Sequence, residues 1–414
     1  MTTTAPESAG APTQDRRPRM GRDWFLLWSA GAVSTLGDGA LLAALPLLAH
    51  RLTDDPRLIS GITLAAGLPW LLLAVIGGTI VDRFDRRRLM VAAQVGQGLL
   101  VAGIALTATL GLHQVWPLYV LAFGVGTGDV LFSGANQALV VNVVPSDLLE
   151  AANGRQIATE SVTRDFAGPP LGAALFAFWL PLPFWIDALT FLTSLLLVLR
   201  IRRLPRQERV NAPASLFAGT AEGLRFLLGH RLLRNLSLMA AASNFCKTMA
   251  LSTLVLFARD ILHVGDSGYG LLLAAMAVGG VLGGLASKRL VDRFGGRAVA
   301  LTVQLAGPFI WFAIGVLGRS ALVVVALFTL RSASLSVWNV VSGTLKQRLT
   351  PNALLGRVSG AGRMLAYGAI PLGALAGGMV ADSYGLVAPW TVGAVLNLAV
   401  VLLALPTLRR WDND

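Results

Sequence analysis

Long apolar stretches recur twelve times in this 414-residue chain and constrain its fold more than any other feature. A bilayer's hydrocarbon core is about 30 Å thick, so a helix that rises about 1.5 Å per residue needs roughly 20 apolar residues to cross it. Lipid offers no hydrogen-bond partners to the backbone, so each span must be a helix. We therefore predict an all-α membrane protein with twelve transmembrane helices, near 24–49, 58–81, 89–112, 116–144, 157–180, 182–200, 236–258, 268–290, 298–317, 321–345, 359–381 and 388–406.

The charge of the chain is consistent with this prediction. Charged residues make up 14% of the sequence and mean hydropathy is +0.66, whereas soluble domains carry about 25% charged residues. The net charge of +12 is distributed by topology, because nearly all Lys and Arg outside the predicted spans fall on the side of the termini. Only Arg51, Arg57, Arg259 and Arg319 fall on the opposite side. By the positive-inside rule both termini are cytoplasmic, in a multi-pass protein of the inner or cytoplasmic membrane. No nucleic-acid partner is expected.

The sequence repeats itself at half its length. The phrase VDRF occurs at 81–84 and 291–294, and PSDLLEAANG (145–154) aligns with PNALLGRVSG (351–360). Such a repeat indicates a duplicated six-helix unit. We expect bundles at 23–201 and 236–406, a disordered cytoplasmic tail at 1–22 and a short cytoplasmic tail at 407–414. The linker 202–235 contains an amphipathic stretch, which we predict to lie on the cytoplasmic membrane surface.

The repeated phrase belongs to a longer motif. Its first copy contains Gly78, Asp82, Arg83, Asp85, Arg86 and Arg87, and its second contains Asp292, Arg293, Gly295 and Arg297. With twelve spans in a 6+6 arrangement, this pattern resembles the signature of the major facilitator superfamily, although Asp85 replaces a Gly and Lys288 replaces the first Gly of the second copy. The resemblance implies two pseudo-symmetric bundles around a central cavity that opens alternately to either side.

The signature also suggests a gating latch. Asp82 can accept hydrogen bonds from the free N–H groups at another helix's N-terminus, and the neighbouring Arg residues can pair with acids on the moving half. The resemblance places Arg363, near the start of the eleventh span, close to Asp82. Simple positive-inside anchoring is the alternative, and it explains the Arg run but not Asp82.

The fifth span carries a second motif, in FAGPPLGAAL (166–175). Its residues Gly168, Pro169, Gly172 and Ala173 resemble a Gly-Pro-x-x-Gly-Gly pattern that marks many exporters of the superfamily. Proline kinks a helix and small residues permit close approach, so ordinary packing would also produce the pattern. The stretches 35–49, 223–233 and 354–360 resemble the branch of drug, macrolide and siderophore exporters that includes the enterobactin exporter.

Four ionisable residues lie in mid-span, where a charge is costly and requires a reason. Asp38, Asp129, Lys247 and Arg331 are on the first, fourth, seventh and tenth spans, which line the cavity in the resembled fold. They fit a polar translocation path, and static ion pairs are the alternative. Asp38 is our preferred proton carrier because Gly37 and Gly39 flank it, with Asp129 as the second candidate. We interpret the Glu160–Arg164 pair as structural, and Asp187 as a structural cap.

These features together predict a secondary efflux transporter. It would export a small amphiphilic molecule, such as an antibiotic, a macrolide-like compound or a siderophore, by proton antiport with alternating access. We expect no enzyme activity, cofactor or metal, because the sequence has no Walker A motif, no metal-ligand spacing and one cysteine, Cys246. The expected partners are the cargo, protons and the bilayer, and the chain is expected to be a monomer. An uptake permease, a lipid flippase and a non-transporting sensor remain alternatives.

Overall fold

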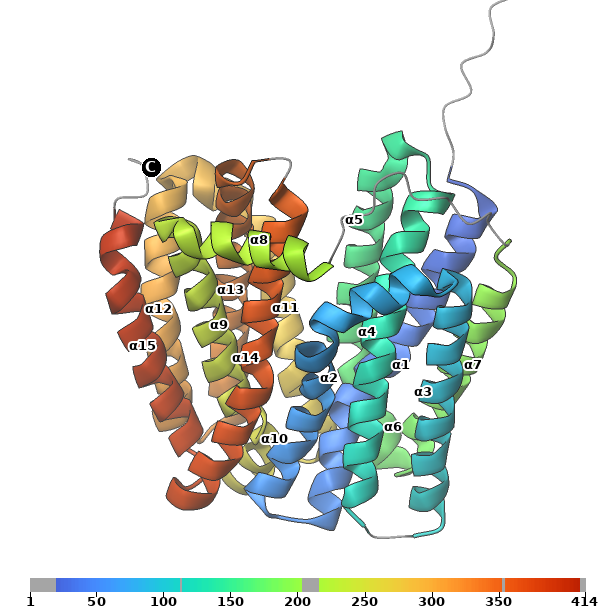
Figure 1. Ribbon diagram of the computed structural model, residues 1–414. Coiled ribbons are helices and arrows are strands. Elements are labelled where there is room, and N and C mark those ends of the chain that lie inside the picture. Colours follow the sequence, from blue (N-terminus) through green and yellow to red (C-terminus); the bar gives the residue numbers. More distant parts are fainter. Residues whose placement is uncertain (1–19, 112–113, 203–215, 352–353, 410–414) are drawn as a thin grey trace, which may run out of the picture.

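The computed structural model describes residues 20–111, 114–202, 216–351 and 354–409. Within these ranges the side chains of 74–83 and of a few other residues lie outside the description. The chain forms two helical bundles side by side (Figure 1). The all-α fold predicted from the sequence is confirmed.

The first bundle contains α1 (Arg22–Leu52), α2 (Pro56–Arg83), α3 (Arg86–Thr109), α4 (Trp116–Val143) and α7 (Leu182–Leu199). Its fifth long helix is built from three consecutive pieces, which follow the short 3₁₀ turn η1 (Ser146–Leu148). These are α5 (Leu149–Glu160), the π-helical η2 (Ser161–Ala167) and α6 (Gly168–Phe178). Each piece is too short to span a bilayer alone, so the predicted span at 157–180 is a composite.

The second bundle follows α8 (Leu216–Gly229), which lies across its end (Figure 1). It contains α9 (Arg231–Leu251), the short α10 (Leu254–Leu256) and η3 (Phe257–Ile261), then α11 (Asp266–Phe294), α12 (Gly296–Leu317), α13 (Ala321–Leu349), α14 (Leu355–Tyr384) and α15 (Ala388–Arg409). α9 therefore begins five residues before the predicted start of the second bundle. In the described chain, ten helices are long and apolar enough to cross a membrane, and the bent pair Arg231–Leu251 and Leu254–Ile261 adds an eleventh.

The packing of the two bundles follows the same plan. In the first, α1 packs on α6 and α7, α3 on α4 and α7, and α2 on α4. In the second, α9 packs on α14 and α15, α12 on α13 and α15, and α11 on α13. Two seams join the bundles, α2 with α14 and α6 with α11. They are equivalent in the repeat, because each pairs the second long helix of one bundle with the fifth of the other. Helix packing thus reproduces the internal repeat of the sequence.

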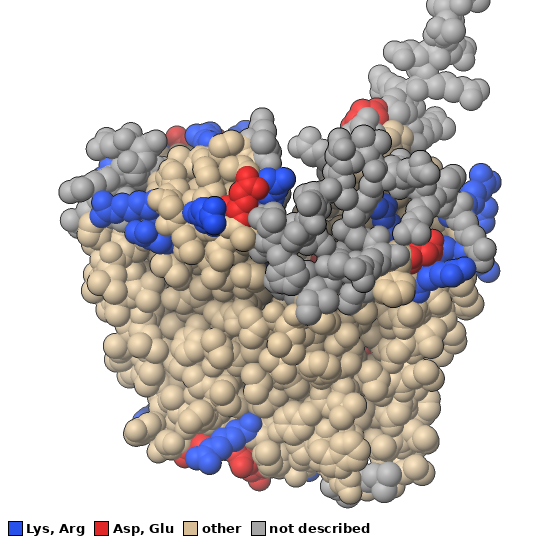
Figure 2. Space-filling model, in the orientation of Figure 1, with Lys and Arg blue, Asp and Glu red and all other residues tan. Residues whose placement is uncertain are grey.

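The two ends of the molecule differ in how the bundles meet. We call the end where α1 begins, α15 ends and α8 lies the basic side, and the other end the opposite side. Figure 2 shows charged side chains at both ends and an uncharged belt between them. On the opposite side one continuous core contains residues of both bundles, among them Leu47, Phe184, Leu254 and Trp390. Toward the basic side each bundle has its own core, and the ribbons diverge (Figure 1). The protein is closed on the opposite side.

The amphipathic stretch of the linker packs on protein. Leu227 of α8 is buried with Leu233, Val358 and Ala361 at the starts of α9 and α14. Gly223 lies against the backbone of Arg357, and the Arg357 guanidinium pairs with Glu222. The apolar face of α8 thus contacts the second bundle, although Leu228 remains exposed. That this helix lies on the cytoplasmic membrane surface stays a prediction.

Candidate transport site

Asp38 lies where α1 closely contacts two other helices, the backbone of η2 and side chains of α7. The side chain is 8% exposed, and its buried Oδ1 has no hydrogen-bond partner. A Cβ at Gly39 would overlap the carbonyl oxygens of Thr163 and Arg164, and a Cβ at Gly37 would overlap the Asp187 carboxylate. The two glycines that flank Asp38 therefore allow α1 to approach η2 and α7, and this approach buries the carboxyl group.

Asp129 of α4 lies close enough to Asp38 for the two charges to interact. Its Oδ1 accepts a hydrogen bond of 2.9 Å from Gln97 Nε2, and its Oδ2 lies 3.7 Å from Arg164 Nη2. Gln97 also donates to the carbonyl oxygen of Val125 at 3.1 Å. Asp129 therefore has partners for both oxygens, whereas one oxygen of Asp38 has none. The two acids therefore differ in their surroundings, and the choice of Asp38 as the proton carrier stays a prediction.

Arg164 has a larger role than its sequence position suggests. Its guanidinium lies 3.9 Å from Glu160, as the spacing of four predicts, but it also reaches Asp129 on another helix. The Asp38 charge acts on Arg164 as well. The interpretation of Glu160 and Arg164 as a local structural pair is therefore incomplete. Arg164 thus links two acids that lie on different helices, Glu160 and Asp129.

The π-helical segment η2 gives Arg164 this position. A π turn holds one more residue than an α turn, and such insertions are frequent at functional sites. Hydrogen bonds fix the segment and the residues just before it to α1. The Thr35 and Thr163 hydroxyls are 2.6 Å apart, and Trp28 Nε1 donates to Thr159, at the end of α5, at 3.0 Å. The extra residue changes which side chains face inward along the fifth helix.

Asp187 of α7 is fully buried beside the same cluster. It follows the start of α7 by more than a turn, and the helix begins without a side-chain cap, so the interpretation as a cap is wrong. Its Oδ1 accepts from Thr190 Oγ1 at 3.0 Å and its Oδ2 has no partner. The Asp187 charge also acts on Asp38. The first bundle thus gathers three buried or half-buried carboxyl groups, of which the sequence analysis assigned two.

The two cavity bases lie apart from these acids, in the second bundle. Lys247 of α9 is half-buried, and Arg331 of α13 is 6% exposed. The charges of Arg331 and of Asp165 in η2, which belongs to the other bundle, both act on Lys247. The four charges predicted to line one path are therefore divided into an acidic group and a basic group.

The helix-5 motif uses its small residues on two faces. Cβ atoms at Gly168 and Gly172 would overlap the backbone of Gly39 and Ala40 in α1. Ala173, which is fully buried, lies against Gly270 of α11, together with Pro169 and Pro170. The motif thus packs one helix of its own bundle and one helix of the other bundle on the closed side.

The latch motif is partly described. The side chains of Asp82 and Arg83 and the surroundings of Gly78 lie outside the description, so the latch stays a prediction. Asp85 caps α3, accepting from the backbone N–H of Arg88 at 2.8 Å, which explains an acid at this position. Arg86 donates to the carbonyl oxygen of Ala138 at 3.0 Å, and Arg87 to those of Val198 and Leu199.

In this conformation Arg86 and Arg87 therefore bind backbone carbonyl groups of their own bundle. Among the residues that the structure describes, the predicted pairing of these arginines with acids of the other half is not seen in this conformation. In the second copy Asp292 and Arg293 are exposed, and Gly295 ends α11 with a φ of +80°. Arg363 is also exposed, on α14.

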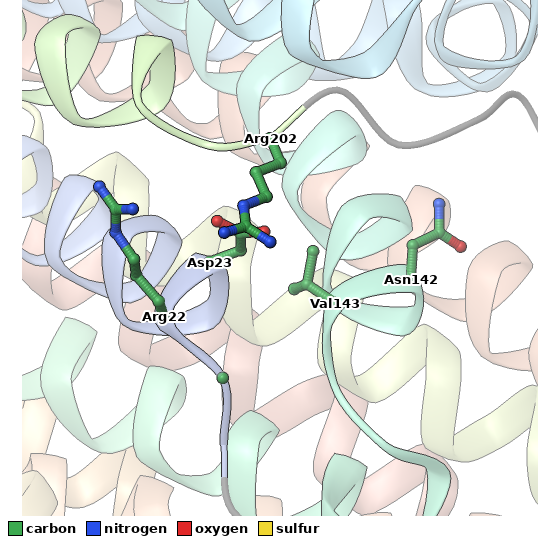
Figure 3. Close-up of a pocket in the computed structure, with 6 residues that line it drawn as sticks. Arg22, Asp23, Asn142, Val143 and Arg202 are labelled. Carbon is green, nitrogen blue, oxygen red and sulfur yellow. The ribbon is translucent and has the colours of Figure 1, made fainter.

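A separate pocket of about 330 Å³ opens at the basic side of the first bundle. It is lined by Arg22 and Asp23 at the start of α1, Asn142 and Val143 at the end of α4, and Arg202 after α7, with Gly21. Figure 3 shows the Arg202 side chain directed over Asp23. None of the residues assigned from the sequence lines this pocket, and no group of described His, Cys, Asp and Glu residues fits a metal ion.

Ion pairs that the sequence did not predict join the two bundles on the closed side. Arg51 of α1 lies 3.0 Å from Asp266 of α11, and Arg57 of α2 pairs with Asp382 of α14. Arg259 also binds Asp266, at 3.1 Å. Of the four arginines predicted on the opposite side, Arg51 and Arg57 therefore join the bundles there, and Arg259 binds the same aspartate as Arg51 from within the second bundle. These arginines could have been singled out from the sequence, because few basic residues fall on the side opposite the termini.

Removing these pairs is expected to favour opening of the closed side. In a Cys246→Ala background, Ser60→Cys places a thiol at a buried position beside Gly378 of the facing helix. A membrane-impermeant maleimide should label it faster in Arg51→Gln and in Arg57→Gln, by roughly two- to fivefold each, since a partly exposed ion pair contributes about 0.2–1 kcal/mol. Arg319→Gln on the same side is the control. Equal rates in all four proteins would contradict a gating role for these pairs.

The comparison with known proteins agrees with this geometry. A major facilitator superfamily family model, described as a transmembrane secretion effector, matches residues 19–414. This chain belongs to the transmembrane secretion effector family. The family is one of membrane transporters, and the chain is a transporter and not an enzyme.

Relatives of this transmembrane secretion effector have named activities. The multidrug efflux pump Tap of Mycobacterium tuberculosis is 27% identical, with 94% of each chain covered. The enterobactin exporter EntS of Citrobacter koseri is 27% identical over 92% of this chain and 91% of the relative. Among solved structures, an inward-facing bacterial homologue of the iron transporter ferroportin has a TM-score of 0.71 at 18% identity, covering 95% of this chain and 99% of that one. The structural likeness establishes the shared fold.

Proposed function

We propose that this protein exports a small amphiphilic molecule across the cytoplasmic membrane by proton antiport with alternating access. The observation that carries the proposal is the buried Asp38 carboxyl group, which has an unpartnered oxygen among other acids. An ionisable group in the membrane interior is costly and is a functional site by default. Proton exchange gives this costly group a purpose.

Export is the direction supported by the relatives and by the fifth helix. Tap and EntS are named as an efflux pump and an exporter, and both match nearly the whole chain. The exporter-like motif packs α6 against α1 and α11, so it lies at a seam that must change when the bundles rock. Uptake is the alternative that a directional assay separates.

The orientation follows from the charge pattern. With the basic side in the cytoplasm, both termini and α8 are cytoplasmic, and the protein is closed toward the outside. The conformation then corresponds to the inward-facing stage, in which cargo enters from the cytoplasm. A single chain supplies both bundles and both seams, so we propose that the monomer is the transporting unit.

Proton exchange at Asp38 would link the two directions of movement. With the cavity open to the acidic outside, Asp38 takes up a proton. With the cavity open to the cytoplasm, it releases the proton as cargo binds. Arg164 lies near the carboxylate that remains after release, and Asp129 and Glu160 hold that cation in position. The net charge of this cluster thus differs between the protonated and deprotonated forms of Asp38. This difference shifts the equilibrium between the two conformations.

Transport in everted membrane vesicles tests direction and coupling together. The vesicle lumen corresponds to the outside, so an acidic lumen should drive accumulation of the cargo. The probes are ethidium, N-phenyl-1-naphthylamine and 1-anilinonaphthalene-8-sulfonate, which cover cationic, neutral and anionic amphiphiles. We expect accumulation of at least one probe, abolished when nigericin collapses the pH gradient. Accumulation that needs no gradient would exclude proton antiport, and transport out of the vesicles would indicate an importer.

A further inference from the structure

We propose that Lys247 and Arg331 form a binding site for an anionic group of the transported molecule. The site lies in the second bundle, opposite the acidic group of the first bundle. Calling the ligand the cargo rests on the proposed transport function, whereas the anion site itself rests on the geometry of the two bases.

Arg331 is a buried cation with unused hydrogen-bonding capacity. Its side chain is 6% exposed and its Nε has no hydrogen-bond partner. The guanidinium carbon lies 5.3 Å from the centre of the Trp311 ring, a cation–π contact. This contact covers one face of the guanidinium and leaves its N–H edge without an acceptor. Burial of such a donor is costly unless an acceptor completes it.

Lys247 brings a second positive charge to the interior of the same bundle. It lies on α9, which contacts α13, and the charge of Arg331 disfavours the charged form of Lys247. In the described part of the chain, no carboxylate lies within ion-pair distance of either base, and Asp165 acts on Lys247 at longer range. Two neighbouring cations in a membrane interior raise the energy of the empty site, and an anion lowers it.

The surroundings determine from which direction an anion arrives. Behind Trp311, the rings of Trp390, Phe257 and Phe328 fill the bundle interior and are fully or almost fully buried. This aromatic cluster is packing core and leaves Arg331 backed by apolar rings. Lys247 is the more exposed of the two bases and interacts with Asp165 of the other bundle. The approach is therefore from the space between the bundles, past Lys247.

The chemistry of the two bases indicates the class of ligand. A guanidinium presents a planar fork that matches the two oxygens of a carboxylate, sulfonate or phosphate, and an ammonium adds a point charge. Asp38 and Asp129 on the facing bundle repel the same group. An amphiphile with one anionic group would therefore bind with that group toward α9 and α13.

Two fluorescent probes with one skeleton test this site. 1-Anilinonaphthalene-8-sulfonate carries a sulfonate that N-phenyl-1-naphthylamine lacks. Binding to the full chain in nanodiscs of zwitterionic lipid is followed by quenching of tryptophan fluorescence, with empty nanodiscs as the blank. The wild type should bind the sulfonate roughly tenfold more tightly than the neutral probe, as charge-assisted hydrogen bonds imply.

The variants assign that preference to the two bases. Lys247→Gln and Arg331→Gln should each lose roughly tenfold in affinity for the sulfonate, while the affinity for the neutral probe stays unchanged. The sulfonate affinity of Arg331→Lys should lie between those of the wild type and Arg331→Gln. Arg319→Gln is the matched control, and Lys247→Gln keeps the test valid if Arg331 variants fail to fold. Equal affinity for the two probes in the wild type, or unchanged sulfonate affinity in both Gln variants, would overturn the proposal.

The binding test is independent of direction and coupling, because it uses no gradient. If vesicles show proton-driven export but the probes bind equally, the proposed function stands and the anion site falls. If the sulfonate preference depends on Lys247 and Arg331 but no gradient drives export, the anion site stands and antiport falls.

Discussion

Asp38→Asn is expected to abolish export driven by a pH gradient while leaving ligand binding and downhill exchange. The amide cannot take up or release a proton, and it imitates the neutral acid at a position where Asp38 is almost completely buried. Exchange of cargo for cargo needs no net proton transfer, so that step should survive. Uphill transport should fall to the level of vesicles without the protein.

Everted vesicles with an acidic lumen measure the uphill step, and preloaded proteoliposomes without a gradient measure exchange. Asp129→Asn is the matched variant, because its carboxylate already has Gln97 and Arg164 as partners. If Asp129→Asn alone uncouples transport, the two roles are reversed. If both variants still export uphill, neither acid carries the proton and the assignment of Asp38 fails.

Gly172→Ala is expected to destabilise the protein by about 1–3 kcal/mol, a typical cost of overpacking, and Gly172→Leu to prevent folding. A Cβ at Gly172 would overlap the backbone of Ala40, so α1 and α6 would have to separate. Backbone cannot rotate away as a flexible side chain can. The separation would also move Asp38, which lies two residues before Ala40.

Gly154→Ala provides the control on the same long helix, because a Cβ there has nothing within 4 Å. The melting temperature of the purified protein should fall in Gly172→Ala and stay level or rise in Gly154→Ala, since alanine favours helix over glycine. Equal melting temperatures for Gly172→Ala and the wild type would show that α1 and α6 adjust without strain, and the close-packing account of the helix-5 motif would be wrong.

The fold could be predicted from the sequence because the features that determine it are local. Span length, composition and the repeat are visible in the residues themselves, and they predicted two helical bundles. The division of the fifth span was not visible, because a π insertion changes the register without a compositional mark. Arg164 was paired only with Glu160 because sequence spacing reveals neighbours on one helix, whereas Asp129 lies on another helix.

The cavity charges illustrate the same limit. Asp38, Asp129, Lys247 and Arg331 were found because charge in mid-span is conspicuous, but their grouping depends on how helices face one another. Asp187 was dismissed as a cap because its proximity to α1 depends on Gly37, a residue 150 positions earlier in the sequence. Asp85 was read as a departure from a motif, although an acid directly before a helix is an ordinary cap signal.

The like packing of the two bundles, combined with their unlike charge, has a kinetic consequence. If protons act on the acids of the first bundle and the cargo's anionic group on the bases of the second, the two ligands occupy different atoms. They then do not displace each other directly, and a complex that holds both is possible. Antiport would arise from thermodynamic linkage, in which each ligand changes the other's affinity through the relative position of the bundles.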